Sequence, residues 1–363
     1  MATLRIFGFS LAVTVVSLVV AYLYGGPTAL FLVIVLSILE VSLSFDNAVL
    51  NATILQRMSL FWQRIFLTIG ILIAVFGMRL IFPLLIVWAT ARLDPVEAMR
   101  LALNPPANGA LEFPDGSPSY EKLISEAHPQ IAAFGGMFLL MLFLDFVFVD
   151  RDIKWLRWLE VPLAGIGRLD QLSVVVASGA LIVTGTLLTH TADELATVMI
   201  AGVLGLLTYL VINGLGRLFH PPEPGLNGPS ELAKATGRAG FFLFLYLEVL
   251  DATFSFDGVI GAFAITADPI IIALGLGLVG AMFVRSITIY LVRKGTLHRY
   301  VYLEHGAHWA IGALAVILLV SIGYHVPEVV TGLVGVTLIA AAYVSSVLRN
   351  RRVQEPEAAL VSS

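Results

Sequence analysis

The chain contains no cysteine and few charged residues. The lack of Cys among 363 residues excludes disulfide bonds, thiolate nucleophiles and soft sulfur ligands for Zn²⁺ or Cu⁺. Any metal site must therefore use oxygen, imidazole or thioether ligands. Charged residues make up 13% of the chain, whereas soluble domains contain about 25%. With 58% hydrophobic residues and a mean hydropathy of +0.93, the composition predicts a polytopic, all-α protein of the lipid bilayer.

Sequence motifs of common enzyme classes are also missing. No H-E-x-x-H, P-loop or G-x-G-x-x-G element occurs in a suitable setting. Asp46 and Asp257 could form the carboxylate pair of an intramembrane aspartyl protease, but Asp257 follows Phe-Ser-Phe instead of the G-x-G-D setting that such proteases need. We therefore expect no enzymatic activity, no prosthetic group and no nucleic-acid partner.

Apolar stretches long enough to cross a bilayer recur along the whole chain. A span needs about 20 apolar residues. The sequence predicts about ten of them, at 4–24, 28–55, 60–89, 130–149, 171–189, 195–218, 239–263, 269–291, 301–322 and 327–347.

The basic residues are distributed very unequally between the two sides of these spans. Of the 21 Lys and Arg residues, only Arg92, Arg100 and Lys122 fall on one side, Arg79 and Arg285 fall within spans, and all others fall on the opposite side. Because basic loops stay in the cytoplasm, this distribution places both termini there and predicts a multi-pass protein of the cytoplasmic (inner) membrane.

Three segments outside the spans carry distinct patterns. The external loop 90–129 is rich in Pro and acids over 92–128, so we expect a mobile or lightly structured segment. Two Trp among basic residues in 150–170 predict an interfacial amphipathic segment. The tail 349–363 is expected to be disordered in the cytoplasm.

A short acidic motif occurs twice. SFDNAVLNATI (44–54) and SFDGVIGAFAI (255–265) match at four of eleven positions, and the predicted topology runs them in opposite directions. In each case the next span carries one Arg, Arg79 or Arg285. We therefore expect two five-helix halves of inverted topology, 1–190 and 191–348, an arrangement found in many secondary transporters.

Helical periodicity groups the polar residues of the two motif helices. One face of each helix carries several of them. These residues are Glu40, Ser44, Asn47 and Asn51 on the second predicted span (28–55, helix two), and Glu248, Asp251 and Ser255 on the seventh (239–263, helix seven). Asp46 and Asp257 point elsewhere if the helices are continuous, and join the same site if both helices are broken at mid-membrane. Gly258 and Gly261 make a break easier in helix seven.

Six acids within the spans outnumber the two arginines. Their combined charge requires cations or protons, and oxygen ligands favour a hard divalent ion, Mn²⁺, Mg²⁺ or Ca²⁺. The predicted metal ligands are Glu40, Asp46, Asn47, Glu248, Asp251 and Asp257, with Ser44, Asn51, Ser255, Arg79 and Arg285 in supporting roles. The alternative is that acids and arginines only pair with each other to hold the helices together.

Further polar residues lie toward the cytoplasmic ends of the spans. Asp145 lies close to Asp150 and Arg151, while Glu304 and His308 share a face at the start of helix nine. These three residues, Asp145, Glu304 and His308, are candidates for a path taken by protons or ions. An interfacial polar cluster is the alternative for the pair on helix nine.

The arrangement Glu40, Ser44, Asp46, Asn47, Ala48, followed by a span with an Arg and by a second acidic motif, resembles the TerC-type (tellurium-resistance C) integral membrane proteins. SFDNAV and SFDGVIGAFAIT are most similar to a longer branch of that group known as a domain of unknown function. The resemblance implies a manganese exporter, and Mn²⁺ exchange for protons fits the acidic site. An organic-solute exporter and a non-transporting membrane partner in metal delivery remain alternatives. A homo-oligomer is possible, but no pattern in the sequence supports one.

Overall fold

The protein is built from long helices. The computed structural model describes residues 2–70, 72–81, 95–104, 106, 110–169, 171–218, 235–266, 268–293 and 300–361, and these contain helices, two isolated β-bridges and no strand. The helices of the first part are α1 (Ala2–Leu43), α2 (Phe45–Leu55), α3 (Leu60–Ile65), the π-helical η1 (Phe66–Gly70) and η2 (Ile73–Ile81), α5 (Pro95–Leu103), α6 (Tyr120–Val147), α7 (Arg157–Ile166) and α8 (Leu172–Leu188). The later helices are α9 (Ala192–Leu218), α10 (Gly237–Ile265), α11 (Pro269–Ile272), the π-helical η4 (Ala273–Gly280), α12 (Ala281–Arg293), α14 (Leu303–Ser321) and α15 (Glu328–Val361).

Seven helical stretches among the described residues are long and apolar enough to cross a membrane. They are Ile6–Ile38, Leu60–Gly77, Tyr120–Val147, Ala192–Gly214, Ile270–Val292, Leu303–Ser321 and Val330–Arg351. They do not include α8, which has 17 residues, or α10, which has 29, and they count α1 once. The protein is therefore a multi-pass membrane protein by length and composition, while the count of ten spans stays a prediction.

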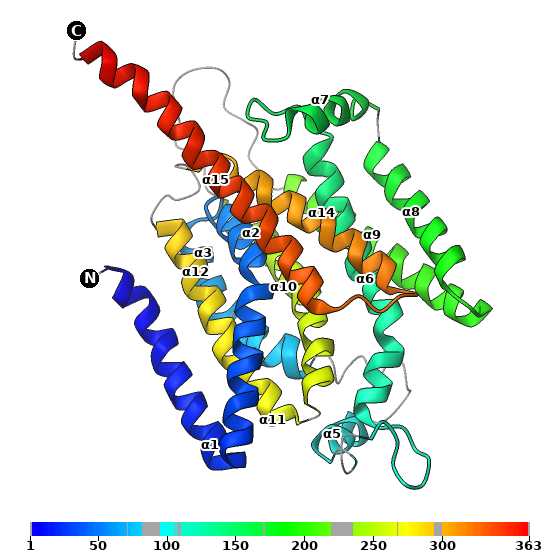
Figure 1. Ribbon diagram of the computed structural model, residues 1–363. Helices are drawn as coiled ribbons and strands as arrows, with labels where there is room; N and C mark the ends of the chain where they lie inside the picture. Colours follow the sequence, from blue (N-terminus) through cyan, green and yellow to red (C-terminus); the bar gives the residue numbers. More distant parts are fainter. Residues whose placement is uncertain are drawn as a thin grey trace.

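α1 bends sharply where the sequence predicts the turn between the first two spans. Gly25 and Gly26 have non-helical backbone angles. Gly26 has φ 67° and ψ −154°, a conformation that residues other than glycine rarely adopt. Pro27 follows directly, and its fixed φ suits the start of a new helical arm. The two arms of α1 therefore run in opposite directions, as Figure 1 shows.

α6 forms the centre of the largest apolar core. Met137, Phe138, Leu139 and Met141 are completely buried, and the same core includes residues of α9, α10 and α14. α9 and α14 pack against α6 (Figure 1). α6 begins at Tyr120, ten residues before its predicted start, because the Ser119 hydroxyl caps it by accepting a hydrogen bond from the N–H of Lys122 at 3.1 Å.

Two sequence expectations about segments outside the spans are wrong. The loop at 92–128 contains α5 and the first turns of α6, so it is partly helical. The tail is also helical, since α15 continues to Val361. In the segment RVQEPEAALV, six of ten residues are Gln, Glu, Ala or Leu, which favour a helix, and α15 continues through Pro356.

The ends of the helices define two ends of the molecule. The C-terminal ends of α2 and α6, the short helix α7 and the N-terminal ends of α10 and α14 gather at one end, here called the basic end because Arg57, Arg151 and Lys154 belong to it. The bend of α1, α11 and α5 lie at the other end (Figure 1).

Candidate functional site: two acidic helices and a polar cavity

The backbone of the first acidic motif is only slightly irregular. α1 ends at Leu43, Ser44 has φ −96° and ψ 13°, and α2 begins at Phe45. The N–H of Ser44 donates to the carbonyl of Glu40 at 2.9 Å, and the N–H of Ala48 donates to the carbonyl of Ser44 at 3.0 Å. The helical hydrogen bonds therefore continue across Ser44, and the irregularity of the predicted span 28–55 at this motif is limited to one distorted residue.

The second acidic motif shows no break at all. α10 runs from Gly237 to Ile265 and includes Gly258 and Gly261. The interruption of this helix that would turn Asp257 toward the site, which the sequence left open, is therefore absent from the backbone of α10. Glycine permits an interruption but does not force one, and an interrupted helix leaves backbone groups without partners in an apolar environment.

A hydrogen bond joins the two acidic segments. The Asn47 amide Nδ2 donates to the Asp251 carboxylate Oδ1 at 2.7 Å, across 204 positions of sequence. Within the first segment, the Ser44 hydroxyl donates to the Glu40 carboxylate Oε1 at 2.7 Å. Glu40 is 1% exposed and Asp251 is 6% exposed, so both acids lie inside the protein. The structure thus pairs Glu40 with Ser44 and Asn47 with Asp251.

Glu248 is buried in a different way. Its side chain is 6% exposed, and neither carboxylate oxygen has a hydrogen-bond partner among the residues that the structure describes. The Oδ1 atom of Asn51 is in the same condition. Buried polar atoms without partners cost free energy, about 1–3 kcal/mol for each neutral group and more for a charged one. A ligand that contacts the Glu248 carboxylate and Oδ1 of Asn51 would therefore remove part of this free-energy cost.

Glycines in π-helical segments allow two of the acids to pack closely. A Cβ on Gly70, the last residue of η1, would lie 2.6 Å from Oε1 of Glu248, and a Cβ on Gly280, the last residue of η4, would overlap Cγ of Glu40. Each acidic helix thus rests against a π-helical segment from the other part of the chain. π-Helical turns are frequent at functional sites.

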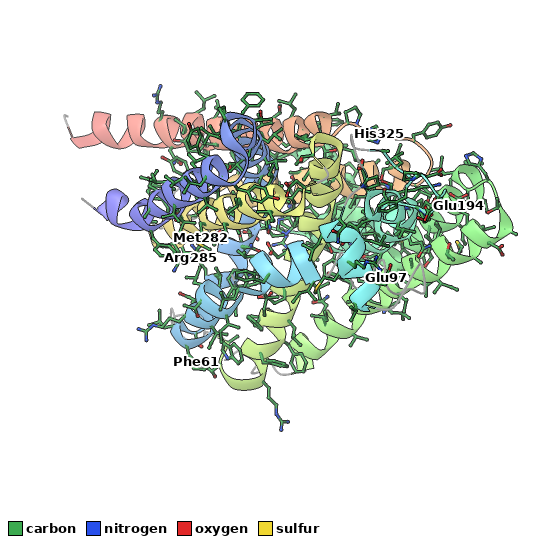
Figure 2. The ribbon with its side chains drawn as sticks, turned by 90° about the horizontal axis from the view of Figure 1, so that it is seen from below. Phe61, Glu97, Glu194, Met282, Arg285 and His325 are labelled. Atoms are coloured by element: carbon green, nitrogen blue, oxygen red, sulfur yellow. The ribbon has the colours of Figure 1, made fainter. Side chains whose placement is uncertain are left out.

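Arg285 is placed at the side of this region. Its Nε donates to the carbonyl of Leu67 at 3.0 Å, and its guanidinium lies 5.9 Å from the ring centre of Phe9. Figure 2 shows it close to Met282 on α12. The contact to Leu67 joins α12 to η1, while the predicted role of Arg285 beside the acids stays a prediction.

Several predicted site residues have side chains outside the described part of the structure. They are Asp46, Arg79, Ser255 and Asp257. Among the side chains that are described, no group of three His, Asp or Glu residues lies close enough together to hold a metal ion. The described acids therefore form pairs and single sites, and the complete predicted ligand set stays a prediction.

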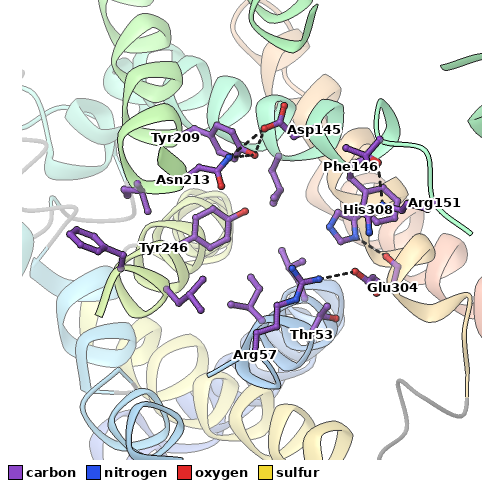
Figure 3. Close-up of a pocket in the computed structure, with 17 residues that line it drawn as sticks. Thr53, Arg57, Asp145, Phe146, Arg151, Tyr209, Asn213, Tyr246, Glu304 and His308 are labelled. Carbon is purple, nitrogen blue, oxygen red and sulfur yellow. Dashed lines mark hydrogen bonds and ion pairs between the residues drawn. The ribbon is translucent and has the colours of Figure 1, made fainter. Parts of the chain in front are cut away.

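A polar cavity of about 430 Å³ lies at the basic end (Figure 3). It is lined by residues of α2, α6, α9, α10 and α14, and it brings together Asp145, Glu304 and His308, the three residues predicted for a path of protons or ions. The Tyr209 hydroxyl donates to Oδ2 of Asp145 at 2.8 Å, and the Asn213 amide donates to the same oxygen at 3.5 Å. Tyr209 and Asn213 thus orient this carboxylate.

Charges of both signs line the cavity. Arg57 and Glu304 form an ion pair at 3.4 Å, with 59% and 33% of their side chains exposed. Burial lowers the pKa of the Arg151 guanidinium, while the charge of Glu304 acts in the opposite direction. The Arg151 guanidinium lies 4.2 Å from the ring centre of Phe146, and His308 stacks on the same ring at 3.7 Å. The two arginines balance Asp145 and Glu304, so the cavity has little net charge.

Glu160 is an important buried residue that sequence reasoning missed. It is 5% exposed and accepts hydrogen bonds from the Trp309 indole at 3.0 Å and from the backbone N–H of Trp155 at 3.1 Å. His305 Nδ1 lies 3.1 Å from the same carboxylate. These contacts hold α7 against α14. The available signal was an acid in the first turn of a predicted amphipathic segment, which is a common place for an acid that binds backbone N–H groups.

Comparison with known protein families gives one match, which covers most of the chain. The family profile described as Protein of unknown function (DUF475) matches residues 45–353, which include Phe45 and Asp46 of the first acidic motif, the whole second motif and the cavity. Neither curated proteins nor solved structures gave a match.

Proposed function

This chain belongs to the DUF475 family, and we propose that it is a membrane transporter for a hard divalent cation, with Mn²⁺ as the favoured substrate. The observation that carries the proposal is the environment of Glu248. This carboxylate is buried, its oxygens have no hydrogen-bond partner among the described residues, and it lies one helical turn from Asp251, which is bonded to the other acidic segment through Asn47. Acids within membrane spans are costly and usually mark an ion or proton path.

The types of ligand support this class of ion. Carboxylate, amide and hydroxyl oxygens suit Mn²⁺, Mg²⁺ and Ca²⁺, and the chain has no cysteine for softer metals. Mg²⁺ gives up its water reluctantly, and Ca²⁺ takes six to eight oxygen ligands. A site of a few carboxylates and amides therefore favours Mn²⁺. An organic solute would need a roomier and less acidic site than the one around Glu248.

The proposed mechanism is alternating access between the two acidic segments. The cation binds between α1–α2 and α10 on the cytoplasmic side and leaves on the other, while protons take its place on the carboxylates. The ten spans, the inverted halves, the inner membrane with both termini in the cytoplasm, and the resemblance to TerC-type exporters belong to this proposal. The contacts of Glu248 with η1 and of Glu40 with η4 support it, because an inverted repeat relates such pairs.

Flux in inverted vesicles tests the proposed function. Asp251→Asn and Glu248→Gln keep the side-chain shapes but remove charge, and we expect each to lower Mn²⁺ flux about tenfold or more, as loss of a metal ligand does. Asp46→Asn and Asp257→Asn test the remaining predicted ligands. Glu97→Gln is the control, because Glu97 is a partly exposed acid on α5 that pairs with Arg100. Unchanged movement of Mn²⁺, Mg²⁺ and Ca²⁺ in folded Asp251→Asn and Glu248→Gln protein would contradict the proposal.

A further inference from the structure

The polar cavity and the buried acids lie along the same pair of helices. The carbonyl of Arg57, just after α2, accepts a hydrogen bond from the N–H of Ala235, just before α10, at 2.8 Å. Asn47 near the start of α2 meets Asp251 in the second half of α10. α2 and α10 are therefore antiparallel, with the Asn47–Asp251 bond on the inner side and the Arg57–Ala235 bond at the basic end.

The cavity comes within a few residues of that inner bond. On α2 its lining begins at Leu50, three residues from Asn47, which corresponds to a rise of about 4.5 Å. On α10 its lining ends at Tyr246, five residues from Asp251, or about 7.5 Å. Glu248 lies between Tyr246 and Asp251 on α10, and Asn51 directly follows Leu50 on α2; buried oxygens of both lack hydrogen-bond partners among the described residues.

We propose that this cavity is the vestibule through which a hydrated divalent cation reaches Glu248 and Asp251, and that Asp145 is the first carboxylate to bind it. This inference rests on the proposed function. A divalent ion with six water molecules needs about 180 Å³, at about 30 Å³ for each water. The cavity of about 430 Å³ holds such an ion with further water. Tyr209 and Asn213 hold the Asp145 carboxylate in place at the wall of this space.

The charges and the apolar boundary suit a vestibule. Arg57 and Arg151 offset Asp145 and Glu304, so a cation binds weakly here and can move on, which is a requirement for any site along a transport path. Leu50 is 1% exposed and Leu247 is completely buried, and both belong to the apolar core beside the cavity. Leu50 forms part of the wall of the cavity, so the apolar core reaches the vestibule on the α2 side.

Single cysteines can test the vestibule directly, because the natural chain has none. Ile212 lines the cavity, whereas Val211, the preceding residue of α9, does not line it and is 56% exposed on the apolar surface. In membrane vesicles, a charged and membrane-impermeant thiol reagent should modify Ile212→Cys about tenfold faster than Val211→Cys, because only a hydrated thiol ionises readily. Equal rates, or modification of Ile212→Cys only from the membrane face opposite the basic end, would overturn the proposal.

Protection by Mn²⁺ tests the role of Asp145. Added Mn²⁺ should slow the modification of Ile212→Cys, Asp145→Asn should abolish this protection, and Asp145→Glu should restore part of it. Asp251→Asn should leave the protection intact, because Asp251 lies deeper. Protection that survives Asp145→Asn, while Asp251→Asn still stops flux, would overturn the vestibule and leave the proposed function standing. Protection that depends on Asp145 in a protein whose flux does not depend on Asp251 or Glu248 would contradict the proposed function instead.

Discussion

The segment that joins α1 to α2 and the helix α10 carry the same Ser-Phe-Asp tripeptide, but their acids find different partners. In the first segment, Glu40 accepts a hydrogen bond from Ser44, one turn away on the same segment. In α10, Asp251 accepts from Asn47 of the first segment, and Glu248 has no hydrogen-bond partner among the described residues. The first segment thus supplies donors to both helices, and α10 supplies mainly acceptors. A bound cation would replace the missing donors on the α10 side.

Asn47→Asp tests this difference in donors and acceptors most directly, because it replaces the donor on the first segment with an acceptor. It removes the donor and places a second carboxylate against Asp251, where the amide nitrogen now lies 2.7 Å from Oδ1. We expect the free energy of unfolding in detergent to fall by about 3–5 kcal/mol without metal, as for a buried charge that loses its partner. Millimolar Mn²⁺ should restore much of the loss, measured as the shift of the unfolding midpoint.

The matched control for this substitution is Asn104→Asp. Asn104 is exposed after α5, where its amide donates to the carbonyl of Arg100 at 2.8 Å. Its unfolding midpoint should change little and should not respond to Mn²⁺, because surface substitutions are usually worth less than about 0.5 kcal/mol. Equal effects of the two substitutions would contradict the special environment of Asn47.

Two glycine substitutions compare how tightly Glu40 and Glu248 are packed. Gly280→Ala places a methyl group against Cγ of Glu40, near the backbone, whereas Gly70→Ala places it against the flexible carboxylate end of Glu248. We expect Gly280→Ala to lower the free energy of unfolding by about 1–3 kcal/mol and Gly70→Ala to lower it less. Gly179→Ala on α8 is the control, because no atom lies within 4 Å of the added methyl and the helix should gain up to about 1 kcal/mol. A larger loss at Gly70 than at Gly280 would reverse the comparison.

Ser44→Ala sharpens the comparison within the first segment. The change removes the donor to Glu40, and the expected loss is about 1 kcal/mol, the net value of a buried hydrogen bond. Ser345→Ala on α15 is a control for the loss of a hydroxyl, because Ser345 is only half-buried and bonds its own helix at Ala341. If both variants unfold at the same midpoint, Glu40 does not depend on Ser44.

Arg57→Gln should have the smallest effect. The Arg57–Glu304 pair joins the end of α2 to α14 at the cavity, but more than half of the Arg57 side chain is exposed. Such pairs contribute about 0–1 kcal/mol, less at high salt. The unfolding midpoints of wild type and variant should therefore converge as NaCl is raised. A large difference that persists at high salt would show that this pair, and not the backbone bond between Arg57 and Ala235, holds the end of α2.

The bounds of a helix could be predicted well where they coincide with the ends of an apolar stretch, and less well where a capping residue or a polar helix-favouring segment sets them. The turn at Gly25 and Gly26 and the bounds of α8, α9 and α10 agree closely with the predicted spans. The start of α6 and the end of α15 do not, because the Ser119 cap and the helix-favouring tail act outside the apolar stretches. The sequence left open whether the two acidic helices are broken, because glycine only permits a break. α10 is continuous, which agrees with the cost of unpaired backbone groups in an apolar environment.

What the sequence by itself determined is the class of protein, the oxygen-rich chemistry available to a metal and the face of each helix on which Glu40, Asn47, Glu248 and Asp251 lie. Composition and helical period are local properties, so they can be read without a fold. Only the tertiary structure decided that Asn47 meets Asp251, that Glu248 rests on Gly70, that Glu160 holds α7 against α14, and that Asp145, Glu304 and His308 share one cavity. The physical reason is that periodicity orients a residue on its own helix, whereas its partner depends on which helices pack together and in what register.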